Sequence, residues 1–287
     1  MKLYREFTIR TQPFIPDIVT GFLWDLDISG INEDIDSLII FSDEGTEVSK
    51  ENVTNLLQEL VNQNIITSFE IEVRTCEYKN WNEEWEKGLN IIEVTDNIVI
   101  KPSNKNYENT QNKIVITIDP KMSFGTGEHQ TTKLALRLME RYLRKGMKVL
   151  DVGTGTGILS IAAVKLGAGS AKAIDNDEWF LDNTRENCKI NNAGDKIEIM
   201  LSEIREVEEK DFDLILANIQ KNVLMDISEE IKEKLAGDGI VILSGLLIED
   251  EKVIVERYKE LKFLEHQAMG EWIALVFQKE VNEIISL

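Results

Sequence analysis

Three glycines at alternate positions follow an apolar segment of this chain. Residues 149–152, with the sequence VLDV, lead directly into Gly153, Gly155 and Gly157. Glycine adopts positive φ angles and lets a ligand approach the backbone closely, so such a turn is typical of a nucleotide-type cofactor site. The spacing is G-x-G-x-G, and Ile158 stands where the dinucleotide fingerprint has its third glycine. No Lys-Ser/Thr pair follows, which excludes the phosphate loop of nucleoside triphosphatases.

Acidic residues mark the ends of two neighbouring predicted strands. Asp151 lies just before the glycines, and Asp175 follows the short strand predicted over residues 170–174. A carboxylate after the second strand can accept hydrogen bonds from two ribose hydroxyls. With the glycines, the two acids resemble the S-adenosylmethionine (SAM) site of seven-stranded methyltransferases, where the turn wraps the methionine portion and the second acid holds the ribose. Taken alone, Asp175 is equally consistent with a solvated residue at a strand end.

A longer motif precedes the glycine turn. Residues 118–132 read IDPKMSFGTGEHQTT. Its Asp-Pro pair ends a strand, because proline has no backbone N–H to donate to a neighbouring strand. Phe124 follows in a glycine-containing loop. Thr131 and Thr132 are placed to cap a helix over residues 134–143. The string closely resembles the ribosomal protein L eleven methyltransferase family, whose members modify amino groups of that large-subunit protein.

The resemblance covers about residues 78–278, and the first 75 residues match only in size and pattern. Further matching segments are W-x-x-x-W at Trp81 and Trp85, A-N-I at 217–219 and S-G-L-L at 244–247. The two tryptophans share a helix face, and packing against a neighbouring domain is preferred to contact with a substrate. The resemblance implies SAM as the cofactor. The residues expected to bind it are Phe124, Thr132, Asp151, Gly153, Gly155, Gly157, Asp175 and Asn218.

Asn218 follows the fourth predicted strand, where this fold places the group that faces the methyl acceptor. Nucleic-acid amino methyltransferases commonly carry [DN]-P-P-[FY] there, whereas this chain reads N-I-Q-K over residues 218–221. A side-chain carbonyl can accept a hydrogen bond from a neutral amine, which makes Asn218 the candidate catalytic residue. The alternative is that Asn218 caps a helix beginning near Val223. His129 is either a general base or, the preferred interpretation, a residue that hydrogen-bonds within its own loop.

Composition limits the remaining classes of function. A length of 287 residues suggests about two domains. There is no apolar run long enough for a membrane span, and we expect no secretory signal. Cys76 and Cys188 are far apart, and the chain has only 2 histidines, so we expect free thiols, no metal site and a cytoplasmic location.

The net charge of −20 bears on the partner. An acidic surface repels nucleic-acid phosphates and attracts basic proteins. We therefore expect a basic ribosomal protein as the partner of a monomeric enzyme, without direct binding to nucleic acid or membrane. The alternative is that the acidic excess serves solubility alone.

Hydrophobic periodicity predicts a small N-terminal domain over residues 1–76. Strands are expected over 2–9, 37–41 and 68–74, helices over 16–26 and 49–60, and one strand near 28–35 is uncertain. This pattern indicates a split βαβ, ferredoxin-like α+β domain. In the resembling family, the small domain grips the protein substrate. Residues 77–93 are expected to form a linker helix.

Residues 94–287 are predicted to form a doubly wound α/β methyltransferase domain. A strand expected over 91–100 overlaps its start, and a C-terminal antiparallel pair is expected at its end. The other expected strands cover residues 113–118, 148–151, 172–175, 197–201, 212–217, 239–244, 263–269 and 272–278. Ligands bind at the carboxyl ends of such strands.

The expected reaction is transfer of methyl groups from SAM to lysine ε-amino groups, with an N-terminal α-amine as a further acceptor. One alternative is an enzyme of the same fold acting on another protein's lysine or on a small amine. Another is a non-catalytic SAM-fold protein that acts in ribosome assembly.

Overall fold

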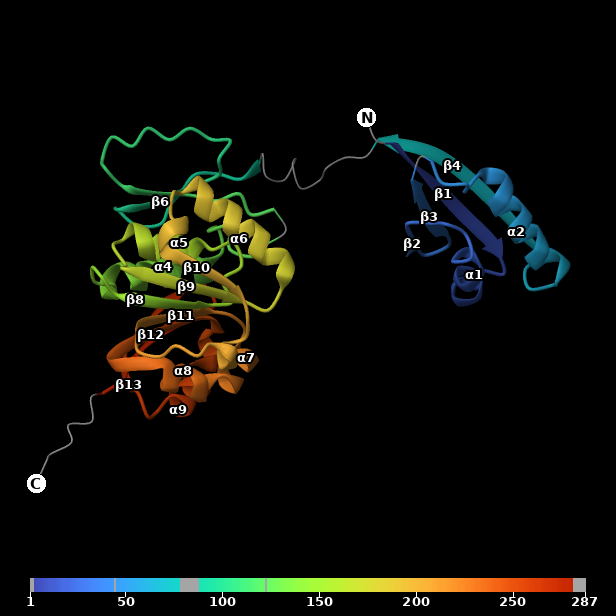
Figure 1. The fold of residues 1–287 in the computed structure, drawn as a ribbon. Helices are drawn as coiled ribbons and strands as arrows, with labels where there is room; N and C mark the ends of the chain where they lie inside the picture. The colour runs from blue at the N-terminus through green and yellow to red at the C-terminus, as the bar shows by residue number, and fades with distance from the viewer. Residues whose placement is uncertain (1–2, 44, 78–87, 122, 281–287) are drawn as a thin grey trace, which may run out of the picture. The chain divides into compact units, whose positions relative to one another are not determined.

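The computed structural model describes residues 3–43, 45–77, 88–121 and 123–280. The chain divides into two compact units, residues 1–81 and 82–287, and each has a hydrophobic core of its own. Figure 1 shows both units, which are described separately below. The predicted tryptophan pair of the linker, Trp81 and Trp85, lies outside the described residues.

The first unit is a four-stranded antiparallel sheet covered by two helices. Its strand order is β2-β3-β1-β4, which is the ferredoxin-like arrangement. The elements are β1 (Leu3–Gln12), α1 (Pro16–Leu23), β2 (Gly30–Glu33), β3 (Leu38–Asp43), α2 (Lys50–Asn62) and β4 (Ser68–Glu77). The predicted fold of this unit is confirmed, and the uncertain strand is β2.

Alternation and helical spacing explain the core of this unit. Phe7 and Ile9 point from β1 toward the helices and are fully buried, as are Val53 and Leu57 of α2. Ser49 caps α2 as expected, because its side chain accepts a hydrogen bond from Asn52 N at 3.2 Å.

The second unit begins with a small three-stranded sheet of β5 (Ile92–Glu93), β6 (Ile98–Lys101) and β7 (Ile114–Thr117). The single strand expected over residues 91–100 is wrong, because a turn divides it into an antiparallel pair. Thr95 Oγ1 closes that turn by accepting hydrogen bonds from Asn97 N at 3.1 Å and Ile98 N at 3.0 Å. The sequence is apolar on both sides of the turn, which conceals the break.

The main sheet of the second unit has seven strands in the order β10-β9-β8-β11-β12-β14-β13. The first five run parallel, and β14 is antiparallel to both of its neighbours. The strands are β8 (Lys148–Val152), β9 (Ser170–Asp175), β10 (Ile197–Leu201), β11 (Phe212–Asn218), β12 (Leu235–Leu247), β13 (Lys262–Met269) and β14 (Trp272–Gln278). The predicted doubly wound α/β domain with a C-terminal hairpin is confirmed.

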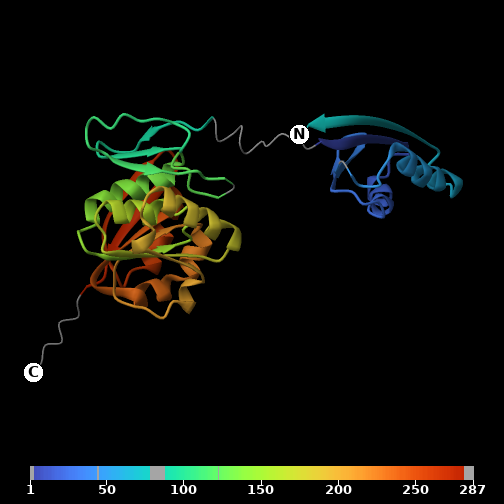
Figure 2. The ribbon, with the colours of Figure 1, turned by 45° about the horizontal axis from the view of Figure 1, so that its top comes forward.

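Helices cover both faces of this sheet, as Figures 1 and 2 show. One layer consists of α4 (Gln130–Tyr142), α5 (Ile158–Lys165) and α6 (Glu178–Ile190), and the small sheet lies on its outer side. The other layer consists of α7 (Lys221–Asp226), α8 (Ser228–Lys234) and α9 (Glu251–Arg257). Strands buried on both faces are mostly apolar, which explains the apolar character of residues 149–150 in β8 and 214–217 in β11.

Helix α4 begins earlier than the sequence predicts. Its N-cap is His129, not Thr131 or Thr132, and His129 Nδ1 accepts a hydrogen bond from Thr131 N at 3.4 Å. Both threonines lie inside the first turn, which places them beside the ends of β11 and β12. In the described part of the chain, no helix is long and apolar enough to cross a membrane.

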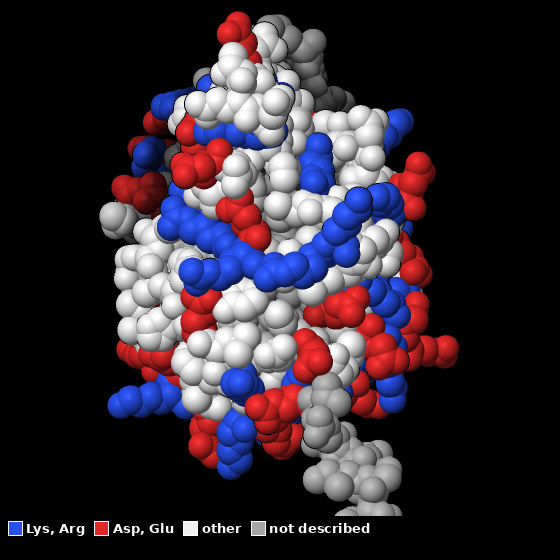
Figure 3. Space-filling model, turned by 90° about the vertical axis from the view of Figure 1, so that its left-hand side faces the viewer, with Lys and Arg blue, Asp and Glu red and all other residues white. Residues whose placement is uncertain are grey.

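Charge is distributed unevenly over the second unit. Figure 3 shows the edge of the main sheet at which the parallel strands begin, and a band of basic side chains crosses it. At this edge Lys148 Nζ donates to Lys210 O at 3.0 Å, and Lys172 pairs with Glu198 at 2.9 Å and with Glu209 at 2.5 Å. Helix C-termini gather at the amino-terminal edge of an α/β sheet, and their partial negative charge favours cations there.

Candidate functional site

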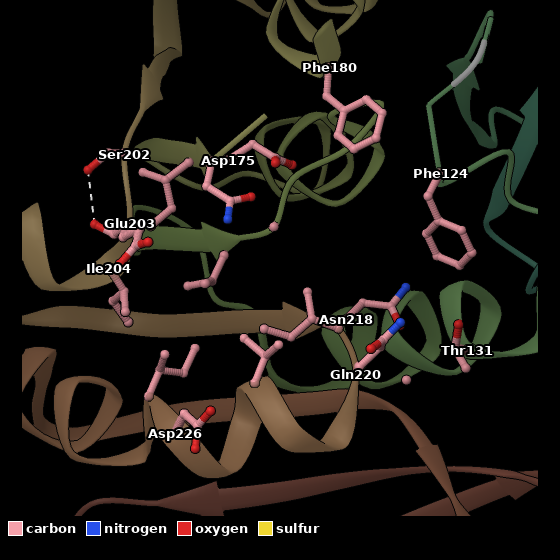
Figure 4. A pocket seen from close by; sticks show the side chains of 18 of the residues that line it. Phe124, Thr131, Asp175, Phe180, Ser202, Glu203, Ile204, Asn218, Gln220 and Asp226 are labelled. Carbon is pink, nitrogen blue, oxygen red and sulfur yellow. Dashed lines mark hydrogen bonds between the residues drawn. The ribbon is translucent and has the colours of Figure 1, made fainter. Parts of the chain in front are cut away.

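A pocket of about 660 Å³ opens at the carboxyl-terminal edge of the main sheet. Figure 4 shows side chains from the ends of β9, β10 and β11 pointing toward one space, with Phe124 on the opposite wall. The residues that follow the parallel strands and line the pocket are Gly153, Asp175, Asn176, Ser202, Glu203, Ile204, Asn218, Ile219, Gln220 and Gly245. Parallel strands end at one edge, so side chains distant in sequence converge here.

The three predicted glycines have different positions in this site. Gly153 lines the pocket with φ +71°, and a Cβ added there would lie 2.5 Å from Ile219 Cγ2. Gly155 supports the turn from outside the pocket, because an added Cβ would lie 2.5 Å from Phe124 O. Gly157 begins α5 in the left-handed region and packs on Thr184. The turn therefore requires glycine both for its backbone angles and for close packing.

Asp151 is buried beneath the turn and does not line the pocket. Its Oδ2 accepts hydrogen bonds from Thr154 Oγ1 at 2.7 Å, Ser160 Oγ at 2.7 Å and Ser160 N at 3.1 Å. Burial raises the pKa of Asp151 to about 6, and the three hydrogen bonds act against that shift. Oδ1 has no partner among the described residues. The structure thus supports a role for Asp151 in holding the turn.

Asp175 lines the pocket, as expected, and it also holds the glycine turn. Its Oδ2 accepts from Gly155 N at 2.9 Å, and its Oδ1 accepts from Asp177 N at 3.2 Å. A carboxylate has about four acceptor sites, so both oxygens retain capacity for ligand hydroxyls. One side chain therefore links the shape of the turn to the polar wall of the pocket.

The loop that carries Phe124 is joined to the glycine turn. Thr156 N donates to Phe124 O at 3.0 Å, and Thr156 Oγ1 donates to Gly125 O at 2.8 Å. Phe124 lines the pocket and is half exposed. Its ring lies 5.5 Å from that of His129, which in turn lies 4.8 Å from Trp272. These three rings form an aromatic wall at one end of the pocket.

Asn218 lies in the pocket lining with its amide held from behind. Its Nδ2 donates to Thr132 Oγ1 at 3.4 Å, while its buried Oδ1 has no hydrogen-bond partner among the described residues. Thr132 itself is fully buried and stays outside the pocket lining, which Thr131 reaches instead. The alternative helix-capping role of Asn218 is wrong, because α7 has Gln220 at its N-cap.

His129 makes the hydrogen bond within its own loop that we expected. Its Nδ1 lies 2.7 Å from Thr131 Oγ1, in addition to the capping bond from Thr131 N. The ring also lines the pocket. The geometry explains His129 as the residue that starts helix α4.

Sequence reasoning missed several pocket residues. Ser202, Glu203 and Ile204 follow β10, whose end was predicted correctly, so the rule that ligands bind at carboxyl ends could have identified them. Trp272 begins the antiparallel strand β14 at the same edge. No rule of this kind marks Trp272 as a pocket residue from the sequence around it.

A scan against protein-family models matches residues 33–280 to "Ribosomal protein L11 methyltransferase (PrmA)". A protein of that name from Caldicellulosiruptor saccharolyticus is 31% identical over 301 aligned positions, covering 96% of this chain and 99% of the relative. The chain belongs to the ribosomal protein L11 methyltransferase family.

Other members of the L11 methyltransferase family are similar over shorter stretches. The Acetivibrio thermocellus protein is 38% identical over 202 residues, which cover 70% of this chain and 64% of that relative. The crystal structure of ribosomal protein L11 methylase from Lactobacillus delbrueckii subsp. bulgaricus superimposes with a TM-score of 0.64 at 32% identity. The superposition covers 67% of this chain and 100% of the L. delbrueckii chain.

Membership in the L11 methyltransferase family implies SAM as the cofactor, and the residues present fit it. The pocket volume of about 660 Å³ lies within the usual range for sites of drug-sized ligands. Apolar side chains of the lining, among them Ile174, Phe180 and Ile204, suit a base, and the Asp175 carboxylate suits ribose hydroxyls. The glycine turn at Gly153 leaves room for close approach of a ligand to the backbone.

Proposed function

We propose that this chain methylates amino groups of ribosomal protein L11, chiefly lysine ε-amino groups and also an N-terminal α-amine, with SAM as the methyl donor. The observation that carries this proposal is the buried, unpartnered Oδ1 of Asn218 in the pocket beside the glycine turn. An amide oxygen accepts hydrogen bonds, so it suits an amine and not a carboxylate or a carbonyl acceptor.

The chemistry asks little of the protein beyond binding and orientation. Bound SAM supplies a methyl group on a sulfonium centre. Asn218 Oδ1 accepts a hydrogen bond from the neutral amine and so fixes the direction of its lone pair, while Thr132 holds the amide from the other side. Phe124 and Trp272 give the acceptor end apolar walls that suit the methylene stem of lysine.

The charge of the chain supports a basic protein substrate. A net charge of −20 attracts basic proteins by long-range electrostatics. We assign substrate recognition to the N-terminal ferredoxin-like unit, because every residue that lines the pocket belongs to residues 124–272. We further propose that the enzyme acts as a monomer in the cytoplasm, where ribosomal proteins are made.

Transfer of a labelled methyl group from SAM to ribosomal proteins tests the proposed methyltransferase function. The purified chain is incubated with methyl-labelled SAM and separated ribosomal proteins, beside an Asn218→Ala variant, and the modified residues are mapped by mass spectrometry. We expect label on amino groups of L11. Label on another protein's lysines would identify an enzyme of the same fold with a different substrate. Binding of SAM without transfer to any protein would support the non-catalytic alternative.

A further inference from the structure

Three asparagines recur at every fourth residue of α6 and its C-terminal end. Asn183, Asn187 and Asn191 are all buried, with exposed fractions of 3%, 0% and 8%. Residues four apart share one face of a helix. A buried face with three carboxamides is unusual, because buried polar groups are costly unless each finds a hydrogen-bond partner.

Asn187 and Asn191 bond to backbone groups of the strand that leads to the Phe124 loop. Asn191 Oδ1 accepts from Thr117 N at 2.9 Å, and its Nδ2 donates to Thr117 O at 2.6 Å. Asn187 Oδ1 accepts from Asp119 N at 3.0 Å, and its Nδ2 makes a longer contact of 3.4 Å with Asp119 O, because its two hydrogens also serve two closer acceptors. Each carboxamide thus pairs with one residue as a neighbouring strand would.

Geometry explains why a helix can replace a strand here. Four helical residues rise about 6 Å, and two strand residues rise about 6.6 Å, so side chains four apart match backbone groups two apart. Residue 118 points to the other edge, where Ile118 N donates to Lys101 O of β6 at 2.9 Å. Helix α6 therefore closes the open edge of β7 and its extension.

The pairing with the backbone differs at Asn183. Asn183 Nδ2 donates to Pro120 O at 2.7 Å, and proline offers no N–H in return. Asn183 Oδ1 accepts instead from Asn187 Nδ2 at 2.6 Å. Pro120 is the point at which the chain leaves the strand direction and enters the Phe124 loop.

Asn187 also contacts the glycine turn. Within the described residues, it is the one of the three asparagines that does so. Its Nδ2 donates to Thr156 O at 3.0 Å. The N–H and hydroxyl of Thr156 hold the far end of the same loop, at Phe124 O and Gly125 O. One carboxamide therefore connects the start of the loop, at Asp119, with the turn that fixes its other end.

We propose that Asn187 is a positioning residue for the SAM pocket, and this inference rests on the proposed use of SAM. Asn187 keeps the Phe124 loop and the glycine turn in the arrangement that binds the cofactor. Without it, the arrangement competent to bind is populated less, and the apparent affinity falls by the same fraction. Asn191 pairs with Thr117 in a similar way and bonds to the backbone carbonyl of Asn187, but it does not touch the turn, so it is the matched control.

The test compares Asn187→Ala with Asn191→Ala by calorimetric titration of SAM and by thermal unfolding. Both variants should lower Tm, because each leaves buried backbone groups without partners. Asn187→Ala should raise the Kd of SAM at least about ten-fold, equivalent to about 1.4 kcal/mol, with a parallel rise in KM for SAM and kcat within about three-fold at saturation. Asn191→Ala should leave the Kd within about three-fold.

Equal changes in Kd for the two variants, or no change in either, would overturn the proposal. Should Asn187→Ala not fold, Asn183→Ala replaces it, because it releases the loop at Pro120 and removes the Oδ1 that holds the Asn187 amide. A Kd no higher than that of Asn191→Ala would then count against the proposal. Failure of the unaltered chain to bind SAM would instead contradict the proposed function, so the two failures are distinguishable.

Discussion

Asn218 is held by a residue of another element, since its Nδ2 donates to Thr132 Oγ1 in the first turn of α4 at 3.4 Å. That bond engages the nitrogen of the amide, while Oδ1 is buried without a hydrogen-bond partner among the described residues. Helix α4 is itself tied to the sheet, because Ser244 Oγ donates to Thr131 O at 3.0 Å. The position of Asn218 in the pocket therefore depends on contacts among α4, β11 and β12.

Asn218→Ala should lower kcat about a hundred-fold while KM for the protein substrate rises only a few-fold. Loss of the amide oxygen leaves the amine bound but poorly oriented, and orientation matters most in the transition state. Steady-state kinetics on L11 measures both quantities. Gln220→Ala is the control, because Gln220 also lines the pocket. A collapse of SAM affinity in Asn218→Ala, with kcat unchanged at saturation, would assign Asn218 to the cofactor instead.

Gly153→Val should abolish SAM binding. The position has φ +71°, and an added Cβ would already lie 2.5 Å from Ile219 Cγ2, so a branched side chain must disturb the turn or enter the pocket. The matched control is Gly194→Val, where an added Cβ meets no atom within 4 Å. Calorimetric titration should show binding in the control alone. Retained binding in Gly153→Val would mean that the turn does not contact the cofactor.

Much of this architecture could be predicted from local patterns. Alternating and helical periodicities identify most strands and helices, and the rule that ligands bind at carboxyl ends correctly places Gly153, Asp175 and Asn218 at one edge of the sheet. These residues converge because parallel strands share a direction. That geometry follows from the order of the elements alone.

Some local caps and turns, and contacts between distant segments, could not be predicted in this way. Thr131 and Thr132 carry strong capping propensity, yet His129 starts α4. The apolar run near residue 95 conceals a turn, because its closing hydroxyl resembles any other threonine. The partners of Asn187 lie 31 and 68 residues away in sequence, so its role depends on tertiary packing.

Ionisation of Asp151 should lower the free energy of unfolding as pH rises from about 4 to about 6. Its pKa is raised from 3.8 to about 6 in the folded chain, so the folded state holds the proton more tightly than the unfolded state. The contribution to stability is therefore greatest below the unfolded pKa, and it is lost as pH rises through the folded pKa. A shift of about two units corresponds to about 3 kcal/mol.

The measurement is the difference in unfolding free energy between the unaltered chain and Asp151→Asn, from urea denaturation at several pH values. Other carboxylates cancel in that difference. We expect the unaltered chain to lose about 2.4 kcal/mol relative to the variant between pH 4 and pH 7. A constant difference would show that Asp151 titrates alike in both states.

A fragment of residues 82–287 should bind SAM with unchanged affinity but lose most activity on L11. The pocket lining belongs wholly to this unit, and β5 pairs with β6 inside it, so a start at residue 94 would remove a strand. Calorimetry and methyl-transfer rates measure the two properties on the same preparation. If the fragment methylates L11 at the rate of the full chain, the N-terminal unit is not the recognition domain.

The rate of methyl transfer should rise with pH above pH 7. A lysine ammonium has no free lone pair, and with a reference pKa near 10.4 only about one molecule in a thousand or fewer is neutral at pH 7. Only the neutral form has a lone pair that can attack the methyl group, so kcat/KM should increase about ten-fold per pH unit until binding or ionisation limits it. The range above pH 7 also avoids the titration of Asp151 near pH 6. His129→Asn separates an effect of the enzyme from that of the substrate, because asparagine can also cap α4. We expect this variant to keep the same slope. A profile that is flat above pH 7 in the unaltered chain but rising in His129→Asn would make His129 the general base.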